Sequence, residues 1–129
     1  MLNSSLKQSF IKYCENNNYE KNLYQLKIIE ALEEFIKPKS KFLNIFSKKN
    51  EKFCFYLYGG VGVGKTMILN HFFQQCNVPK QRFHFNEFMI SFHDSKYINK
   101  IDSINVFVKN LKKKAKLLYL DELQVTNIV

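Results

Sequence analysis

The sequence predicts an α/β fold in which a parallel sheet follows a set of N-terminal helices. Three observations lead to this prediction. All four glycines of the 129 residues lie within positions 59–64, and Lys65 and Thr66 follow at once. An apolar segment stands before these glycines, and a segment with apolar residues at helical spacing stands after them. Farther along the chain, strand-like and helical segments alternate, which is typical of parallel sheets.

The N-terminal part is expected to be helical. Residues 2–16 have apolar residues on one side, and a run of asparagines ends the pattern. Asn22 with Gln25 resembles a capping box, which opens a second amphipathic helix that Pro38 ends. We expect a short helix over residues 39–50, leading to the first strand.

Residues 1–50 would thus form an N-terminal helical segment, and residues 51–129 the sheet-containing core. The elements expected in the core, in order, are a strand over 52–58, a helix over 67–75, a strand over 81–85, a short helix over 87–94, a helix from Asp102 or Ser103 to the lysines at 112–114, and a strand over 116–120.

The glycine cluster has the spacing G-x-x-x-x-G-K-[ST] of a phosphate-binding loop. In such a loop, backbone N–H groups turn inward around the phosphates, which favours glycine. Lys65 would reach the β- and γ-phosphates, and Thr66 would offer its hydroxyl to Mg²⁺. The predicted nucleotide-binding residues are Gly59, Gly60, Val61, Gly62, Val63, Gly64, Lys65, Thr66 and Met67. The alternative, a glycine-rich hairpin turn, needs neither the lysine nor the helix after it.

A second candidate site follows the last predicted strand, which ends in Asp121 and Glu122. At the carboxyl end of a strand beside a phosphate loop, Asp121 can hold the water shell of Mg²⁺. Glu122 can orient or deprotonate the attacking water, so the predicted catalytic residues are Glu122 and Lys65. The glutamate favours hydrolysis of a nucleoside triphosphate over transfer to a small acceptor. The alternative is a strand that runs into a polar turn.

The composition allows a core and gives no sign of a membrane segment. Hydrophobic residues make up 46% of the chain, with thirteen phenylalanines. A run of about eighteen apolar residues, which a spanning helix needs, does not occur, and the start of the chain lacks an apolar signal segment. Cys14, Cys54 and Cys76 are interpreted as buried thiols of a protein in the reducing cytoplasm.

The formal net charge of +9 would ordinarily indicate nucleic acid or an anionic membrane as a partner. The basic residues are nearly all lysine, with Arg82 the single arginine, which indicates a general compositional bias. The densest run, Lys112–Lys114, ends a predicted helix, where cations suit the dipole. We therefore interpret this run as a solvated helix end rather than a binding patch, and do not expect a nucleic-acid partner.

Three stretches, 57–67, 83–89 and 120–128, together resemble the ZapE-type cell-division ATPases of bacteria and their mitochondrial relatives, a branch of the AAA+ superfamily. Within these stretches, Glu-Phe-Met at 87–89 and Asp-Glu-x-Gln-Val-Thr at 121–126 are specific to that family. The resemblance implies ATP and Mg²⁺ as cofactors. His84 and Glu87 match the family pattern without an assigned role, and His84 could also be a packed strand histidine.

The same resemblance implies that the chain corresponds to the N-terminal portion of such an ATPase, with a truncated core. The family's sheet has the order 5-1-4-3-2, and strand 4, a sensor residue, a helical lid and arginines that complete a neighbour's site would come after the second motif. Without strand 4, strands 1 and 3 would either close up or leave backbone groups unpaired. We therefore expect this chain, if it is truncated, to hydrolyse ATP barely above background and to be prone to aggregate.

Three functional hypotheses remain open at this point. The first is a ZapE-like ATPase with a link to cell division. It binds ATP, and its partners are its missing C-terminal part or further copies in an oligomer. The second is a nucleotide-dependent adaptor or loader that acts through a protein partner without hydrolysis. The third is an inert remnant of a split gene.

Overall fold

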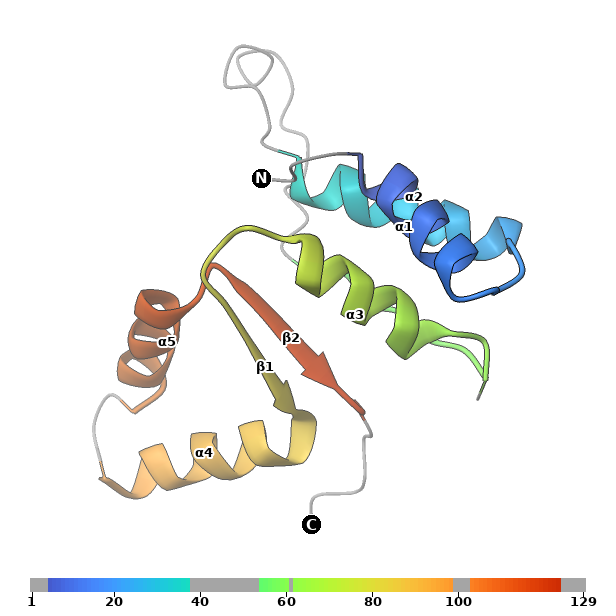
Figure 1. Ribbon diagram of the computed structural model, residues 1–129. Helices are drawn as coiled ribbons and strands as arrows, with labels where there is room; N and C mark the ends of the chain where they lie inside the picture. The colour runs from blue at the N-terminus through green and yellow to red at the C-terminus, as the bar shows by residue number, and fades with distance from the viewer. Residues whose placement is uncertain (1–4, 38–53, 61, 99–102, 124–129) are drawn as a thin grey trace, which may run out of the picture. The chain divides into compact units, whose positions relative to one another are not determined.

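A computed structural model describes residues 5–37, 54–60, 62–98 and 103–123 (Figure 1). The described chain is a helix-rich α/β structure with a parallel sheet of two strands. It divides into two compact units, Met1–Asn77 and Val78–Val129, and each unit is described by itself.

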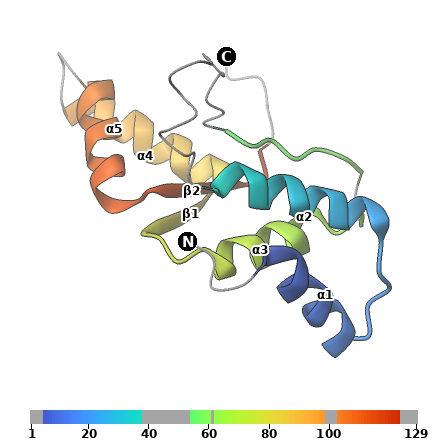
Figure 2. The ribbon, with the colours of Figure 1, turned by 90° about the horizontal axis from the view of Figure 1, so that it is seen from above.

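The first unit is built from three helices: α1 (Leu6–Asn16), α2 (Leu23–Ile36) and α3 (Lys65–Gln75). Both ribbon views show the three lying side by side (Figures 1 and 2), and each contacts the other two. The apolar residues of α1 recur every four positions and therefore share one face. The buried side chains come from the three helices and the residue after α3: Leu6, Phe10, Cys14, Ile29, Leu32, Ile68, His71, Phe72 and Cys76.

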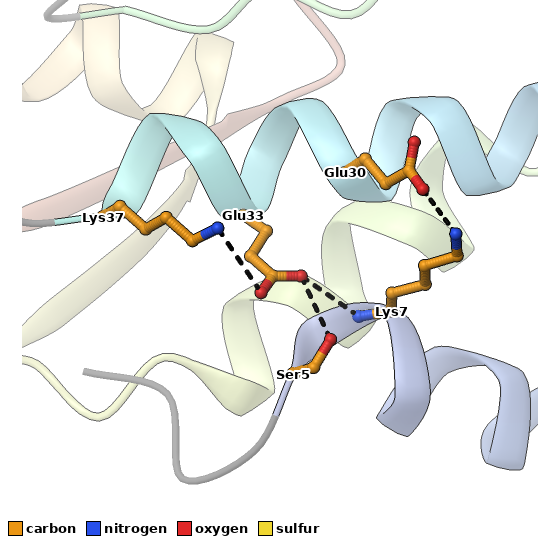
Figure 3. Close-up of polar contacts among 5 residues, drawn as sticks. All are labelled: Ser5, Lys7, Glu30, Glu33 and Lys37. Carbon is orange, nitrogen blue, oxygen red and sulfur yellow. Dashed lines mark hydrogen bonds and ion pairs between the residues drawn. The ribbon is translucent and has the colours of Figure 1, made fainter.

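The start of α1 is stabilised by a carboxylate from α2, as Figure 3 shows. The first turn of α1 has no acidic residue, and the side chain of its N-cap residue, Ser5, makes no capping hydrogen bond. Oε2 of Glu33 accepts instead from the backbone N–H of Lys7 and from Oγ of Ser5, both at 3.4 Å. An ion pair of 2.5 Å between Lys7 and Glu30 lies alongside. Glu33 thus satisfies a free helix N–H and places a negative charge at the positive end of the dipole.

The single polar side chain in the described core is His71 of α3, which is 5% exposed. Its Nε2 lies 2.9 Å from Oγ of Ser9 in α1, and its ring meets that of Phe10 edge-on at 5.3 Å. Burial lowers the pKa of His71, because an imidazolium loses hydration in the core. The hydrogen bond satisfies the buried nitrogen, so α1 and the helix after the loop are joined by a polar as well as an apolar contact.

The three predicted helices of this unit are confirmed where the structure describes them. Asn22 is the N-cap of α2, and its side chain accepts from the backbone N–H of Tyr24 at 2.9 Å. The capping box is wrong in its second half, because the amide of Gln25 donates to the carbonyl of Val63 in the loop before α3. The start of the first predicted helix before Ser5 and the predicted helix over 39–50 lie outside the described residues.

The strand predicted over 52–58 is not found in its described part, residues 54–58. The described sheet consists of two other strands, and Tyr56 and Tyr58 are 62% and 79% exposed. The two tyrosine rings stack on each other at 5.9 Å. An apolar pattern indicates a segment suited to burial, but a strand also needs the hydrogen bonds of a neighbouring strand. The prediction that this segment is a strand buried on both faces is therefore wrong here.

The second unit contains the sheet, formed by β1 (Lys80–His84) and β2 (Leu117–Asp121). The strands are parallel, as predicted, with partners running from Lys80 opposite Leu117 to His84 opposite Asp121. Helices α4 (Phe85–Ile98) and α5 (Ser103–Lys114) connect them, and α4 contacts both strands. Edge-on and tilted ring contacts between 5.4 and 6.1 Å hold the unit together, through Phe83, Phe88, Phe92 and Phe107.

Two boundaries in this unit differ from the prediction. The helix predicted over 87–94 is longer, and Phe85, predicted as the end of a strand, is its first residue. Glu87 lies in the first turn of α4, where its charge suits the helix dipole. The last predicted helix is confirmed, and its final turn carries the lysines at 112–114, as expected.

All three cysteines are free, but they do not share one environment. Cys14 and Cys76 are buried, whereas Cys54 is exposed in the segment without regular structure. The prediction of three buried thiols is therefore wrong at Cys54. Among the helices that the structure describes, none has the length and apolar character needed to cross a membrane.

Candidate functional site

The glycine cluster forms a loop that leads directly into α3, as the spacing predicts. Gly62 and Gly64 both have φ of 81°, in the left-handed region that glycine adopts without a Cβ penalty. Gly64 is the N-cap of α3, and its carbonyl accepts the first helical bond from Ile68 at 3.0 Å. Because glycine has no side chain to cap the helix, the first N–H groups of α3 are suited to an external anion. Val61 lies outside the described residues.

Lys65 bends back over the start of the loop. Its Nζ donates to the carbonyl of Gly59 at 2.7 Å and also to that of Gly60. The ammonium therefore lies over the carbonyls at the start of the loop. A phosphate oxygen is a stronger acceptor for an ammonium than a neutral carbonyl, because the hydrogen bond is charge-assisted on both sides.

The remaining predicted loop residues surround the same helix start. Thr66 and Val63 are exposed, and Met67 is half-buried in the first turn of α3. The hydroxyl of Thr66 is thus accessible to a ligand at the N-terminus of this helix.

Gln25 is a loop contact that the sequence analysis missed. Its Nε2 donates to the carbonyl of Val63 at 3.3 Å. A Cβ built on Gly64 would come within 2.7 Å of the same nitrogen, so the amide lies tight against the loop. In the sequence, Gln25 stands three residues after the N-cap Asn22, which is the spacing of a capping box. This local interpretation gave no indication of the long-range contact with the loop.

In the second unit, Asp121 ends β2 and is the centre of a hydrogen-bonded cluster. Its carboxylate forms an ion pair with Arg82 of β1. It also accepts from the hydroxyl of Tyr119 at 3.3 Å and from the backbone N–H of Glu122 at 3.0 Å. The Asp121 side chain is 13% exposed, against 38% for Arg82. The predicted metal carboxylate is therefore mostly buried and occupied by the one arginine of the chain.

The parallel register explains why these groups meet. Arg82 lies opposite Tyr119, and its guanidinium carbon is 4.8 Å from the centre of the tyrosine ring. Burial raises the pKa of Asp121, but the hydrogen bond and charge of Arg82 outweigh it, so the pKa lies below its ordinary value. Burial, followed by the charge of Asp121, raises the pKa of Tyr119 to about 12. The sequence noted Arg82 as the single arginine, but only the strand pairing identifies its partner.

Glu122 has an unusual backbone. Its φ is 52°, in the left-handed region that residues other than glycine rarely adopt. Such conformations cost of the order of 1–3 kcal/mol and cluster at functional sites. The Glu122 side chain is exposed, so a water molecule can reach it.

His84 and Glu87 are both exposed. The interpretation of His84 as a histidine packed beside phenylalanines is therefore wrong, because its side chain is exposed.

Each unit by itself offers one oxygen donor of the kind that Mg²⁺ prefers. Among the described residues, no three His, Cys, Asp or Glu side chains gather to form a metal cage. Mg²⁺ commonly uses one or two protein oxygens together with phosphates and water. The hydroxyl of Thr66 and the carboxylate of Asp121 are hard oxygen ligands of the type it prefers. Both carboxylate oxygens of Asp121 already accept hydrogen bonds, one from Arg82 and the other from Tyr119 and Glu122.

Comparison with known proteins gives partial matches to longer relatives. The chain is 33% identical over 76 residues to the cell division protein ZapE of Escherichia coli K12, which is 57% of this chain and 20% of ZapE. It is 38% identical over 82 residues to an uncharacterised protein of Schizosaccharomyces pombe, which is 57% of this chain and 18% of that protein. It is 44% identical over 48 residues to lactation elevated protein 1 homolog B of Danio rerio, which is 36% of this chain and 10% of that protein.

The chain thus spans a fifth or less of the length of these relatives. No solved structure matches the sequence. The family model of the AFG1-like ATPases matches residues 5–129. Since this match covers nearly the whole sequence, from the first helix to the motif after the second strand, the chain belongs to the AFG1-like ATPase family.

Proposed function

We propose that this chain binds ATP with Mg²⁺ through residues 59–67 and contributes to ATP hydrolysis. The observation that carries the proposal is the loop that ends in Gly64 at the start of α3, with the Lys65 ammonium over its carbonyls. A loop of this kind offers backbone N–H groups, a helix dipole and a mobile cation to the same anion. Membership in an ATPase family supports ATP as that anion.

Each residue has a separate part in the proposed reaction. Lys65 exchanges its carbonyl partners for phosphate oxygens and neutralises charge there. Thr66 and Asp121 would each offer an oxygen ligand to Mg²⁺, and the bound ion would withdraw charge from the phosphates. Glu122 orients the attacking water and accepts its proton. The roles proposed for Asp121 and Glu122 rest on the sequence motif and on the family. The boundary at residue 50 between an N-terminal helical segment and the ATPase core also remains a prediction.

A nucleotide-dependent adaptor without rapid hydrolysis is the second candidate. The ion pair between Arg82 and Asp121 favours it, because a carboxylate that is engaged by arginine is less available to Mg²⁺. In this alternative, ATP binding changes the contacts of the chain with a protein partner. A role in cell division, as the name of ZapE indicates for that protein, and a place in the cytoplasm also belong to the proposal.

The test is calorimetry of Mg-ATP binding to the chain and to Lys65→Ala. We expect the substitution to abolish measurable binding, because it removes the charge that faces the β- and γ-phosphates. Lys12→Ala is the matched control, since Lys12 is an exposed lysine of α1 and its loss changes the net charge equally. Equal affinity of Lys65→Ala and the unmodified chain would show that the loop is not the nucleotide site.

A further inference from the structure

A hollow of the first unit lies where the start of α1 meets the first half of α2. Its volume is about 360 Å³. Lys7 of α1 lines one side, and five residues of α2 line the rest: Leu23, Tyr24, Leu26, Lys27 and Glu30. None of the described residues of the phosphate loop lines it, so the proposed nucleotide site leaves this hollow without a role.

Most of the α2 side is a stripe along one face of the helix. Leu23, Leu26, Lys27 and Glu30 stand at positions i, i+3, i+4 and i+7, which share a face. Leu26 is half-buried, whereas Leu23 and its neighbour Tyr24 are 75% and 77% exposed. The stripe therefore begins with apolar side chains that stand in solvent and continues into charged ones.

The charges around the hollow favour an acidic partner. Glu30 is paired with Lys7 at 2.5 Å, as Figure 3 shows, so its own negative charge is compensated. Lys27 is exposed, and among the described residues it has no ion-pair partner. The net charge of +9 adds attraction for an acidic partner at longer range. A carboxylate beside an apolar side chain therefore complements this surface.

Contacts between the two helices hold the hollow in shape. Glu33 of α2 accepts from the backbone N–H of Lys7. Leu6 of α1 and Ile29 of α2 are fully buried in the core beneath. The first turn of α2 is fixed by the hydrogen bond from Asn22 to the backbone of Tyr24. A partner would thus meet a surface that is already formed, and little order must be gained on binding.

A segment of another protein fits this surface better than a second copy of the chain. Two copies would bring like charges together, since each carries +9. Stable dimers also bury about 1,200–2,000 Å² in total, whereas this hollow is lined by six residues. An amphipathic helix needs only a few apolar anchors at helical spacing to occupy a groove of this kind.

We propose that this hollow is a docking site for an acidic amphipathic segment of a protein partner. An apolar side chain of that segment contacts Leu23 and Leu26, and a carboxylate pairs with Lys27. This docking site goes beyond the proposed function, because it requires no nucleotide in the loop. It gives the second candidate function, the adaptor, a surface for its partner.

The test is fluorescence anisotropy with three labelled synthetic peptides of about 15 residues, a length at which a helix can form. The acidic peptide has leucines at i, i+3, i+4 and i+7 and glutamates elsewhere. The basic peptide has lysines in place of the glutamates, and the alanine peptide has alanines in place of the leucines. At about 0.15 M salt, where distant charges are screened, we expect the acidic peptide to bind at least about tenfold more tightly than either of the others.

Lys27→Glu should weaken binding of the acidic peptide at least about tenfold, because it places like charges opposite each other. Lys12→Glu is the matched control, since Lys12 is an exposed lysine of α1 outside the hollow, and it should change the affinity less than about twofold. Leu23→Ala should weaken binding about tenfold through lost apolar contact. Tyr58→Ala removes another exposed apolar side chain outside the hollow and should leave the affinity unchanged. Circular dichroism checks that each variant is folded.

The docking site is wrong if the acidic peptide does not bind, or if the basic peptide binds as tightly. Equal binding of the acidic and alanine peptides, or equal effects of Lys27→Glu and Lys12→Glu, would show only the general attraction of a basic chain for anions. A dimer in sedimentation that Leu23→Ala dissociates would assign the surface to a second copy, which also contradicts the proposal. Because the peptides are tested without nucleotide, failure of the docking site and failure of ATP binding are seen separately.

Discussion

At the scale of single residues, Asp121 and Arg82 form an ion pair between the two strands of the sheet. Because the folded pKa of Asp121 lies below its unfolded value of about 3.9, the carboxylate stabilises the fold above that pH. This contribution is lost as the pH falls through the folded pKa. Since Arg82 is 38% exposed, water screens the pair, and we expect it to contribute no more than about 1 kcal/mol.

Arg82→Gln should therefore lower the free energy of unfolding by up to about 1 kcal/mol at pH 7. The difference from the unmodified chain should disappear on acidification below about pH 4, because protonated Asp121 no longer needs the guanidinium. Urea unfolding at a series of pH values measures both. Lys116→Gln, an exposed lysine next to β2, should show no such pH dependence. A stability difference that stays constant down to pH 2 would mean that the ion pair is not its source.

At the scale of the helices, the first unit depends on contacts that one helix supplies to another. α1 begins without an acidic residue or a side-chain cap of its own, and Glu33 of α2 fills that place. The Glu33 side chain is 18% exposed, so it is better shielded than Glu30, which is 51% exposed. A capping group is typically worth about 0.5–2 kcal/mol.

Glu33→Ala should thus lower the free energy of unfolding by about 1 kcal/mol, because it leaves the N–H of Lys7 without its acceptor. Glu34→Ala removes the same charge from the exposed side of α2 and should change it by less than about 0.5 kcal/mol. Denaturant unfolding followed by circular dichroism compares the two. Equal effects of the two substitutions would show that the charge of α2, and not the cap, is responsible.

At the scale of the whole molecule, binding and turnover are expected to depend on different residues. Mg-ATP at about 100 times its dissociation constant should stabilise the chain by about 2.7 kcal/mol. Glu122→Gln should retain this gain, since the side chain acts on water and not on the nucleotide. It should lower any hydrolysis by at least about a hundredfold, the size of a general-base contribution.

Thermal unfolding with and without Mg-ATP and a phosphate-release assay measure the two effects separately. Lys65→Ala should lose the stabilisation, which makes it the contrasting variant. Rapid hydrolysis that Glu122→Gln leaves unchanged would exclude Glu122 as the group that activates water.

The sequence by itself determined the local features of this protein. Gly62 and Gly64 allow a left-handed backbone, and the residues after Gly64 form α3. The turn and the helix could both be predicted because each depends on backbone groups that are close in sequence. The helices α1, α2 and α5 also follow from local periodicity and capping. The parallel arrangement of the two strands was predicted from the alternation of strand-like and helical segments. The motifs carried the family resemblance, which the family match confirms.

Only the tertiary structure decided which distant groups meet. Gln25 contacts Val63, and Arg82 contacts Asp121, across 38 and 39 positions of sequence. Residues 54–58 are apolar enough for a strand, yet they form none in the described chain. The physical reason is common to all three cases: ladder bonds and long-range polar contacts need a partner brought near by packing, and periodicity along one segment contains no information about that partner.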